Sequence, residues 1–403
     1  MIPLEKLQDK VRKTTRIFPW YKELIGGDGD IASGINRLQE LPLMTADIFE
    51  TYYYHRPHDP SLAVYRTSGT GSGRRKAILY SEEDDTNYIQ IKTKLFGELT
   101  AGSGCIKALA DMGTGHAANT ALDIFERLGM EGRSIAFELP IERHIEELQT
   151  FQPDLLYTMP SILDHIVYAT ENPRAFGIRK IMLVGEIAPP EWQRNMARLF
   201  GLDPSDIIDT YGSIEIGTIA YYSHDLGRYI LVDGLFAEGI GAQELDEGLE
   251  PLGDNEKILV LTSFVRTMLP AIRFVTYDVV RDFRPVMVDG VMKQSFQSIV
   301  KRVGRELKHG EKISLYDIEQ AVYRHVEDAI IRVKVRNNVL AVQIKSKSEM
   351  DSVLPAIREE IRACIPEIGM MIRNRLLDDI EVIAVGEDQP LENGRVKNKK
   401  IYY

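Results

Sequence analysis

The sequence predicts an α/β protein with a large N-terminal domain and a small α+β C-terminal domain. Three observations carry this prediction. Between Cys105 and Gly217, apolar runs alternate with helical runs, which is typical of parallel or mixed sheets flanked by helices. After Gly217, short strands follow one another and predict a β-rich subdomain. Near Gly304 the pattern changes to mixed helices and strands, so we expect domains at 1–303 and 304–403.

Bulk composition agrees with more than one domain and narrows the partners. The chain has 403 residues, 44% of them hydrophobic, which suffices for a large buried core. Its formal net charge of −11 disfavours a general nucleic-acid partner. The two cysteines, Cys105 and Cys364, lie far apart, and this disfavours structural zinc and a disulfide scaffold.

The N-terminal segment MIPLEKLQDKVRK has the pattern of an amphipathic helix and lacks the apolar core of a secretion signal. No stretch approaches the length of a transmembrane helix. We therefore expect a cytoplasmic protein without a membrane partner. A homodimer is the default expectation for its oligomeric state.

The expected elements follow from periodicity and from turn residues. Residues 1–60 have a mainly helical pattern. In the next region, strands are expected at 105–112, 134–139, 154–159, 180–184 and 206–212, and helices at 117–129, 141–151, 161–169 and 190–200. The later strands are expected at 228–233, 257–264, 271–280, 290–296 and 298–304, as an antiparallel sheet or distorted barrel. For the C-terminal domain we expect helices at 315–325 and 349–363 and strands at 330–335, 340–345 and 379–385.

Residues 64–81, VYRTSGTGSGRRKAILYS, place a loop rich in glycine and hydroxyl groups, closed by three cations, between two strand-like runs. Glycines let backbone N–H groups approach an anion, and hydroxyls and cations add donors and charge. The loop is not a P-loop, because no Gly-Lys-Ser/Thr follows at the required spacing. An ordinary basic hairpin turn is the alternative. The residues expected to bind phosphate are Ser68, Gly69, Thr70, Gly71, Ser72, Gly73, Arg75 and Lys76, with Arg74 as a further cation.

Glycines and polar residues follow the expected strands at their carboxyl ends, where α/β sheets collect ligands. Gly185 and Glu186 follow one strand, and Tyr211 and Glu215 follow the next. A tyrosine there can stack on a purine, and a carboxylate there can hold Mg²⁺ that bridges phosphates. The alternatives are a packed core aromatic for Tyr211 and a solvated charge for Glu215.

The segment GTGHAA follows the first of these strands. It resembles a Gly-x-Gly-x-x-Ala dinucleotide turn only formally, since no acidic residue closes a strand at the expected spacing, so a nicotinamide site is disfavoured. Its small residues leave room for a substrate, and we expect Gly113, Gly115 and His116 to line a pocket. A satisfied polar residue is the alternative to a general base at His116.

Two further positions have both a functional and a plain structural interpretation. Asp278 interrupts the apolar strand at 271–280, where it can accept hydrogen bonds from a ribose diol or mark the polar face of an edge strand. Arg302 and Arg305 flank Gly304 at the expected domain boundary. They suit a hinge that touches a nucleotide, or a basic linker.

In this order the segments RTSGTGSGRRK, YGSIE and LVLTSFVRTMLPAIRFVTYD resemble the adenylate-forming superfamily of acyl-CoA synthetases, peptide-synthetase adenylation domains and luciferases. The resemblance is greatest to the phenylacetate-CoA ligase-like enzymes and covers nearly the whole chain, from LPLMTADIFETYY onward. Such enzymes use ATP to convert a carboxylate into an acyl-adenylate and pyrophosphate, and then pass the acyl group to a thiol, usually that of coenzyme A. The resemblance thus implies ATP, Mg²⁺ and coenzyme A.

The resemblance also implies residue roles. Tyr211 would stack on adenine, Glu215 would bind Mg²⁺, Asp278 would bind the ribose, and Arg305 would belong to a hinge about which the C-terminal domain rotates. Besides the phosphate loop, the implied ATP and AMP site contains Gly185, Glu186, Asp209, Tyr211, Gly212, Ser213, Asp278, Arg302 and Arg305. The implied substrate pocket contains Gly113, Gly115, His116, Met159, Gly185 and Gly217.

The chain departs from the family pattern at several positions. The phosphate loop is one residue longer, Ile214 replaces a threonine, and Tyr277 replaces a glycine. The hinge ELKHGEKIS is shorter than usual. In PLENGRVKNKKIYY, which is similar to the segment that supplies the adenylation lysine, Arg395 follows the glycine and Lys397 comes later. We expect Lys397 to take the catalytic role with Arg395 as the other candidate, and a solvated basic tail is the alternative.

Together these features predict an AMP-forming ligase that activates a small carboxylic acid, aromatic acids included, and transfers it to coenzyme A. The alternative acceptors are a carrier-protein pantetheine, an amine or a protein side chain. A catalytically silent homologue that binds a nucleotide or an acyl group is the rival from another class, motivated by Ile214, Tyr277 and Arg395. A dehydrogenase is a more distant rival.

Overall fold

The computed structural model describes residues 2–26, 31–55, 59–66, 76–112, 116–303, 314–336, 339–365, 368, 372–373, 377–386 and 401–402. The chain divides into two compact units. Unit 1 comprises residues 1–94, 212–221 and 228–298, and unit 2 comprises residues 95–211, 222–227 and 299–403. The predicted boundary at residue 304 lies outside the described residues.

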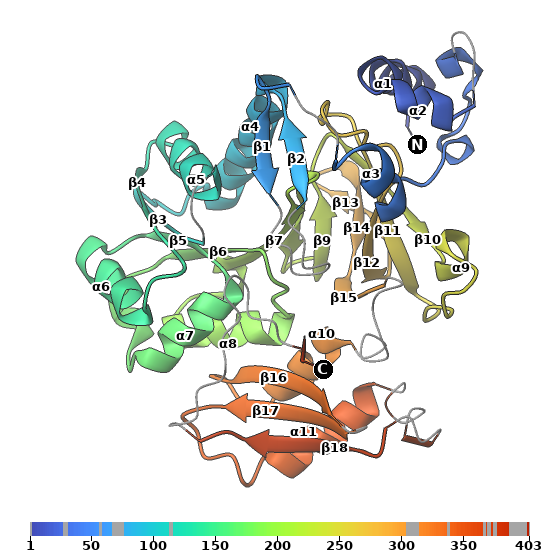
Figure 1. The fold of residues 1–403 in the computed structure, drawn as a ribbon. Coiled ribbons are helices and arrows are strands. Elements are labelled where there is room, and N and C mark those ends of the chain that lie inside the picture. Colours follow the sequence, from blue (N-terminus) through green and yellow to red (C-terminus); the bar gives the residue numbers. More distant parts are fainter. Residues whose placement is uncertain are drawn as a thin grey trace. The chain divides into compact units, whose positions relative to one another are not determined.

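Unit 1 begins with short helices and continues with antiparallel strands (Figure 1). Its helices and 3₁₀ turns are α1 (Leu4–Ile17), α2 (Pro19–Leu24), η1 (Ile31–Gly34), η2 (Leu38–Glu40), α3 (Ala46–Tyr52), most of α4 (Glu82–Thr100) and α9 (Ala242–Leu245). Its strands are β1 (Ala63–Arg66), β2 (Ala77–Tyr80), most of β8 (Gly217–Ser223), β9 (Arg228–Leu231), β10 (Leu235–Ile240), β11 (Glu256–Ser263), β12 (Phe274–Arg281), β13 (Arg284–Val288) and β14 (Val291–Phe296). The pairs β10–β11, β11–β12 and β13–β14 are antiparallel, as the sequence predicts for this region.

An aromatic cluster and a buried lysine hold the N-terminal helices of unit 1 in place. The rings of Trp20 and Tyr52 stack with centroids 5.1 Å apart, and Phe49 meets Phe274 of β12 edge to face at 5.5 Å. Lys10 of α1 is only 6% exposed and donates a hydrogen bond of 2.5 Å to the carbonyl oxygen of Arg266. The predicted helical N-terminal region therefore packs against the β-rich part of unit 1.

Unit 2 contains a five-stranded parallel arrangement in the order β7-β6-β5-β3-β4. Its strands are β3 (Lys107–Asp111), β4 (Glu131–Ile135), β5 (Leu155–Thr158), β6 (Lys180–Val184) and β7 (Ile207–Ser213), the last two residues of which belong to unit 1. The helices and 3₁₀ turns between them are α5 (His116–Arg127), α6 (Ile141–Phe151), α7 (Pro160–Ala169), η3 (Pro173–Phe176), α8 (Pro190–Phe200) and η4 (Pro204–Asp206). Strand–helix alternation in this region is confirmed.

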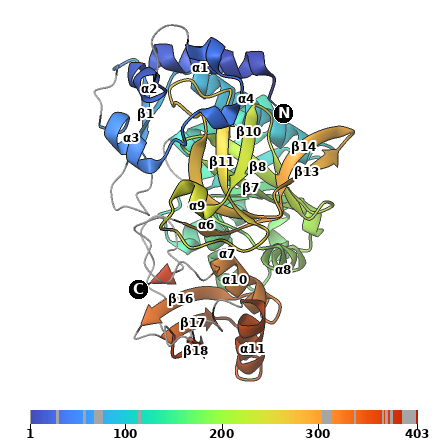
Figure 2. The ribbon, with the colours of Figure 1, turned by 90° about the vertical axis from the view of Figure 1, so that its right-hand side faces the viewer.

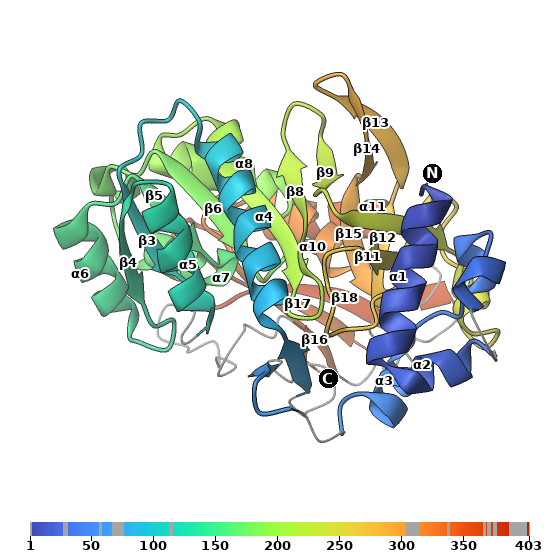
Figure 3. The ribbon, with the colours of Figure 1, turned by 90° about the horizontal axis from the view of Figure 1, so that it is seen from above.

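Helices cover both faces of these parallel strands, because alternate side chains of each strand point to opposite faces. On one face, Leu109, Leu156 and Leu183 join a hydrophobic core with residues of α6, α7 and α8. On the other face, Tyr157 meets Phe96 near the end of α4 edge to face, with centroids 5.0 Å apart. Figure 3 shows the end of α4 and α5 on this second face.

The C-terminal elements of unit 2 form a four-stranded sheet in the order β18-β17-β16-β19 with two helices that pack together (Figure 2). They are α10 (Leu315–Tyr323), β16 (Ile330–Arg336), β17 (Val339–Lys345), α11 (Leu354–Cys364), β18 (Asp379–Ala384) and β19 (Ile401–Tyr402), after β15 (Ser298–Arg302). The predicted α+β character of this region is confirmed.

Several bounds differ from the expected ones. Strand β4 occupies Glu131–Ile135, ahead of the expected 134–139, because its register on β3 pairs Lys107 with Glu131. Helix α11 begins at Leu354, after the expected start at 349, with a proline in its first turn, where the missing N–H costs no helical bond. The long helix α4 and strands β8, β10 and β13 were not among the expected elements.

No helix within the described ranges is both long enough and apolar enough to cross a membrane.

Lys10 gives the fold a testable dependence on pH. Burial lowers the pKa of Lys10 to about 8 from 10.5, so between these values the unfolded chain binds more protons than the folded chain. The free energy of unfolding should therefore rise with pH through this window. Urea unfolding at about pH 7.5 and about pH 10 should show wild type gaining stability relative to Lys10→Met as the pH rises.

The matched control is Lys13→Met, because the Lys13 side chain lies on the same helix and is 65% exposed. Its stability relative to wild type should not change between the two pH values. If the free energies of unfolding of Lys10→Met and wild type differed by the same amount at both pH values, the folded chain would not depress the pKa of this lysine.

Candidate active site

The strands on either side of the predicted phosphate loop form an antiparallel hairpin. β1 and β2 pair from Ala63 with Tyr80 to Arg66 with Ala77, so the ends of residues 67–76 are held close together. The loop residues Ser68, Gly69, Thr70, Gly71, Ser72, Gly73, Arg74 and Arg75 lie outside the described residues. Their phosphate-binding role stays a prediction, whereas the flanking strands are confirmed.

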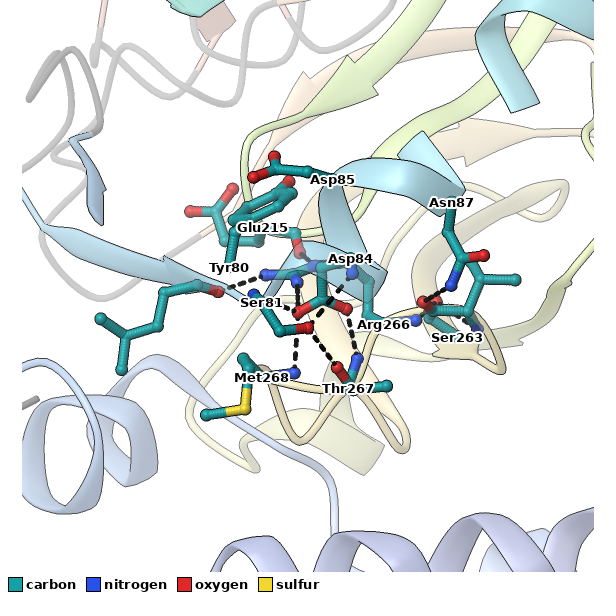
Figure 4. Close-up of polar contacts among 12 residues, drawn as sticks. Tyr80, Ser81, Asp84, Asp85, Asn87, Glu215, Ser263, Arg266, Thr267 and Met268 are labelled. Atoms are coloured by element: carbon teal, nitrogen blue, oxygen red, sulfur yellow. Dashed lines mark hydrogen bonds and ion pairs between the residues drawn. The ribbon is translucent and has the colours of Figure 1, made fainter. Parts of the chain in front are cut away.

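Next to this hairpin, a buried ion pair joins α4 to the segment after β11 (Figure 4). Arg266 Nη1 and Asp84 Oδ2 are 2.5 Å apart, and the two side chains are 3% and 0% exposed. The Asp84 carboxylate also accepts hydrogen bonds from the backbone N–H groups of Thr267, Met268 and Ser81, at 2.6, 2.9 and 3.3 Å. Burial disfavours the charged carboxylate, but Arg266 and these donors outweigh it and hold the pKa of Asp84 below its usual value.

The same arginine fixes the turn that carries Glu215. Arg266 Nε donates to the carbonyl oxygen of Glu215 at 2.9 Å, and Nη2 donates to that of Leu79 at 3.0 Å. The Arg266 guanidinium lies 3.7 Å from the centre of the Tyr80 ring, and the Tyr80 hydroxyl donates to the carbonyl oxygen of Ile214 at 2.7 Å. Strand β2 and residues 214–215 are therefore held by one guanidinium.

Lys76, the last residue of the predicted phosphate loop, is held by α3 and the residues after it. Its Nζ lies 3.6 Å from Oε1 of Glu50 and 4.8 Å from the centre of the Tyr54 ring. Burial raises the pKa of the Tyr54 hydroxyl, and the nearby carboxylates of Glu215 and Glu50 raise it further. Lys76 and Glu215, predicted as phosphate and metal ligands, thus both lie near Tyr54.

Asp278 lies in an irregular part of β12. Ile258 pairs with Val279 and Val260 pairs with Val275, so three residues of β12, 276–278, lie opposite a single residue of β11. Tyr277 has φ +64°, in the left-handed region, and its hydroxyl accepts a hydrogen bond of 2.9 Å from the N–H of Ala46. β-bulges re-aim side chains and often lie next to active sites. The irregularity distinguishes Asp278 from an ordinary residue of an edge strand.

Two glycines let the strands around Glu215 approach closely. A Cβ on Gly212 would lie 2.7 Å from the carbonyl oxygen of Gly217, which no side chain tolerates. Gly217 has φ +94°, a conformation suited to glycine. Between them the hydroxyl of Ser213 accepts a hydrogen bond of 3.3 Å from the N–H of Ile216. Gly212, Ser213 and Gly217, all predicted site residues, thus define the turn that presents Glu215.

In unit 2 the parallel register aligns another set of predicted residues. Thr158 pairs with Leu183, and Val184 pairs with Thr210. Met159, Gly185 and Tyr211, which follow these positions, therefore lie at the same carboxyl edge. This is the edge where doubly wound sheets bind ligands.

Two carboxylates lie at this edge as well. Glu186 Oε2 accepts a hydrogen bond of 2.9 Å from the N–H of Ser161, in the first turn of α7. The buried Asp209 accepts a hydrogen bond of 3.4 Å from the N–H of Ala188. Both residues were predicted as part of the nucleotide site.

The sequence analysis missed a buried pair at the end of β3. His144 Nδ1 lies 2.8 Å from Oδ1 of Asp111, and its Nε2 lies 3.1 Å from the carbonyl oxygen of Leu139. Burial alone would lower the pKa of His144, but the Asp111 carboxylate outweighs it and raises the pKa. The sequence offered one signal for this pair. Asp111 ends an apolar strand, and His144 lies on the second helix after that strand.

The remaining predicted residues lie at the ends of described segments or outside the described residues. Arg302 ends β15 and is exposed. His116 begins α5, and its side chain lies outside the described part of the structure. Gly113, Gly115, Arg305, Arg395 and Lys397 lie outside the described residues. Among the residues whose placement is described, no three His, Cys, Asp or Glu side chains gather as metal ligands.

Comparison with known proteins yields a family match and a close relative. A family model, the C-terminal domain of fumarate–diaminopropanoate ligase, matches residues 308–388. Over 377 residues the chain is 37% identical to a fumarate–(S)-2,3-diaminopropanoate ligase from Enterobacter agglomerans, and the match covers 93% of each protein.

Solved structures with a similar fold include two ligases. A 2-hydroxyisobutyryl-CoA ligase, solved in the postadenylation state with R3-HIB-AMP, has a TM-score of 0.77 at 15% identity over 99% of this chain and 88% of the other. The amide bond synthetase McbA from Marinactinospora thermotolerans has a TM-score of 0.54 at 14% identity over 86% and 68%. At these identities the likeness concerns the fold.

The Asp84–Arg266 pair leads to a stability prediction. Arg266→Met leaves the buried Asp84 carboxylate without its ion-pair partner, and this should lower the free energy of unfolding by about 3–5 kcal/mol. Arg284→Met makes the same chemical change at a side chain that is 59% exposed, so it should cost less than about 0.5 kcal/mol. Urea unfolding of the two variants measures the difference.

If Arg266→Met cost no more than Arg284→Met, the buried pair would not organise this part of unit 1. Adding Asp84→Asn to Arg266→Met should restore part of the loss, since the uncompensated charge is then removed.

Proposed function

We propose that this chain uses ATP to join a small carboxylic acid to an amine. It belongs to the adenylate-forming ligases and to the family of the fumarate–(S)-2,3-diaminopropanoate ligase of Enterobacter agglomerans. The observation that carries the proposal is the 37% identity across 93% of both proteins. The predicted membership of the adenylate-forming enzymes is confirmed, and so is the α/β fold class. Fumarate and 2,3-diaminopropanoate, which the relative's name gives as its substrates, are the first acid and amine to test.

In the first half-reaction a carboxylate oxygen of the acid attacks the α-phosphorus of ATP. The bond from that phosphorus to the bridging oxygen breaks, and pyrophosphate leaves with the electron pair. We assign the β- and γ-phosphates to the loop from Ser68 to Lys76, where the hairpin register and the position of Lys76 support the assignment. Hydrogen-bond donors and cations there would stabilise the charge that develops on pyrophosphate.

Glu215 is the proposed Mg²⁺ ligand. A single carboxylate suits this ion, which binds proteins through one or two carboxylates together with substrate phosphates and waters. Bound there, Mg²⁺ would neutralise charge on the phosphates as pyrophosphate leaves. The rigid turn between Gly212 and Gly217, with its carbonyl bonded to Arg266, supports the assignment because a metal ligand must be held in place.

Tyr211 and Asp278 are the proposed contacts to the nucleoside. Tyr211 lies at the carboxyl edge beside Gly185 and can stack on adenine. Asp278 lies in the irregular part of β12 and can accept hydrogen bonds from both ribose hydroxyls.

In the second half-reaction the nitrogen of the uncharged amine attacks the carbonyl carbon of the acyl-adenylate. The carbon–oxygen bond to AMP breaks, and the surplus proton on nitrogen passes to solvent. Lys397 or Arg395, in the proposed C-terminal domain of residues 304–403, is the proposed cation for adenylation. The match of residues 308–388 to a ligase C-terminal domain supports that domain assignment.

Coenzyme A is the second candidate acceptor. The structural likeness to a 2-hydroxyisobutyryl-CoA ligase, with a TM-score of 0.77, favours it, as does the resemblance to phenylacetate-CoA ligase-like enzymes. The amine is preferred because the relative that supports it is far more similar in sequence.

A product assay distinguishes the acceptors. When 2,3-diaminopropanoate is added to the enzyme with ATP, Mg²⁺ and fumarate, we expect AMP to accumulate. Mass spectrometry should then detect the amide of the two substrates. A mass for an acyl-CoA, with no amide from any amine of a panel, would establish the second candidate in place of the first. No exchange of labelled pyrophosphate into ATP with any acid would contradict both and favour a silent homologue.

Glu215→Gln tests the proposed metal ligand. The change preserves volume and removes a charge, so we expect the rate of pyrophosphate exchange to fall about 100-fold or more. The control is Glu247→Gln, which makes the same change at an exposed carboxylate and should exchange like wild type. Equal rates in Glu215→Gln and wild type, with equal thermal unfolding midpoints, would exclude Glu215 as a ligand.

A further inference from the structure

The tyrosines around strand β2 and the Glu215 turn differ in how their hydroxyl groups are bonded. The hydroxyls of Tyr53, Tyr80 and Tyr277 all form hydrogen bonds with backbone groups of other segments, at 2.7 to 3.0 Å. The Tyr54 hydroxyl forms no hydrogen bond with any residue that the structure describes. Tyr54 therefore carries a polar group that the internal bonding of unit 1 does not use.

The ring of Tyr54 is nevertheless held in place. The N–H of Tyr54 donates a hydrogen bond of 3.0 Å to the carbonyl oxygen of Phe49. The centre of its ring lies 5.8 Å from that of Phe49 and 5.6 Å from that of Tyr53. A phenylalanine would make the same ring contacts, and a partly buried hydroxyl without a partner costs free energy. Packing alone therefore does not account for the hydroxyl.

The surroundings of Tyr54 indicate which partner its hydroxyl suits. The Nζ of Lys76 lies 4.8 Å from the centre of the Tyr54 ring and 3.6 Å from Oε1 of Glu50. Burial raises the pKa of the Tyr54 hydroxyl, and the carboxylates of Glu215 and Glu50 raise it further. The hydroxyl therefore stays protonated at neutral pH. It is a neutral hydrogen-bond donor near the last residue of the predicted phosphate loop and near the proposed metal ligand.

A phosphate oxygen is the acceptor that fits this position. Hydroxyl donors form their shorter and stronger hydrogen bonds with anionic oxygens. The two nearby carboxylates, of Glu50 and Glu215, do not accept the Tyr54 proton within the described structure. Lys76 supplies a positive charge beside the ring, and such a charge favours an anion there. The hydroxyl is thus available to an anionic ligand that lies next to Lys76.

We propose that the Tyr54 hydroxyl donates a hydrogen bond to a β- or γ-phosphate oxygen of ATP and keeps that bond as pyrophosphate leaves. This inference rests on the proposed adenylation of a carboxylic acid. It adds to the phosphate site a residue that lies outside the loop from Ser68 to Lys76. Because negative charge develops on pyrophosphate as it leaves, a fixed donor at this position stabilises the transition state.

Tyr54→Phe is the test, because it removes the hydroxyl and keeps the ring contacts with Phe49 and Lys76. A hydrogen bond to a charged group is lost, so the Kd values of ATP and of pyrophosphate, measured by calorimetry with Mg²⁺, should rise about 10-fold or more. The Kd of AMP should change less than about twofold, since AMP has no β- or γ-phosphate.

Tyr52→Phe is the matched control. Tyr52 ends α3, two residues before Tyr54, and its ring stacks on Trp20 with centres 5.1 Å apart. The same hydroxyl is removed, but away from the proposed phosphate site. Tyr52→Phe should bind ATP, pyrophosphate and AMP as wild type does.

Thermal unfolding separates a binding role from a structural one. Tyr54→Phe should unfold at the wild-type temperature or above, since the hydroxyl it removes has no partner among the described residues. Unchanged Kd values for ATP and pyrophosphate in this variant would overturn the proposal. Equal weakening of ATP and AMP would also overturn it, because the hydroxyl would then not act on the outer phosphates.

The binding measurements need no acid substrate, and this keeps the proposal distinct from the proposed function. Weaker binding of ATP and pyrophosphate to Tyr54→Phe would support the role of Tyr54 even if no acid supported pyrophosphate exchange in wild type. That absence of exchange would count against the ligase activity alone. Wild-type rates of exchange in Tyr54→Phe, or no binding of ATP and pyrophosphate to wild type, would overturn the role of Tyr54.

Discussion

The buried ion pair between Asp84 and Arg266 is the interaction on which the arrangement of unit 1 depends. It joins the start of α4 to the segment after β11, and the same guanidinium bonds to carbonyl oxygens of β2 and of Glu215. A buried charge pair of this kind is stable only when all its donors and acceptors are matched. The strand that follows the predicted phosphate loop and the turn of the proposed metal ligand consequently have fixed positions relative to each other.

Much of the fold was predictable from local patterns. The parallel strands and helices of residues 105–212 were expected because the alternation of apolar and amphipathic runs is a local property. Helix α4, which begins two residues after the end of β2, was missed. The pairing of Asp84 with Arg266 joins segments far apart in the sequence, and no periodicity reports such a contact.

The candidate site was predictable in part, for similar reasons. Glycines such as Gly212 and Gly217 mark positions of close approach, and a sequence displays them directly. The strand irregularity at Tyr277 was not predicted, because an aromatic residue in an apolar run indicates a regular strand. In the structure the φ of Tyr277 is +64°, in the left-handed region.

The central claim is that the chain activates a carboxylate by adenylation, and the fate of the carboxylate oxygens tests it most directly. With an acid labelled in its carboxylate by ¹⁸O, and with the acceptor that yields product, adenylation places one labelled oxygen in each AMP released. The attacking carboxylate oxygen stays bonded to the α-phosphorus when the acyl group is transferred. We predict labelled AMP in the same amount as the acyl product. Label in inorganic phosphate, with ADP as the other product, would contradict the account.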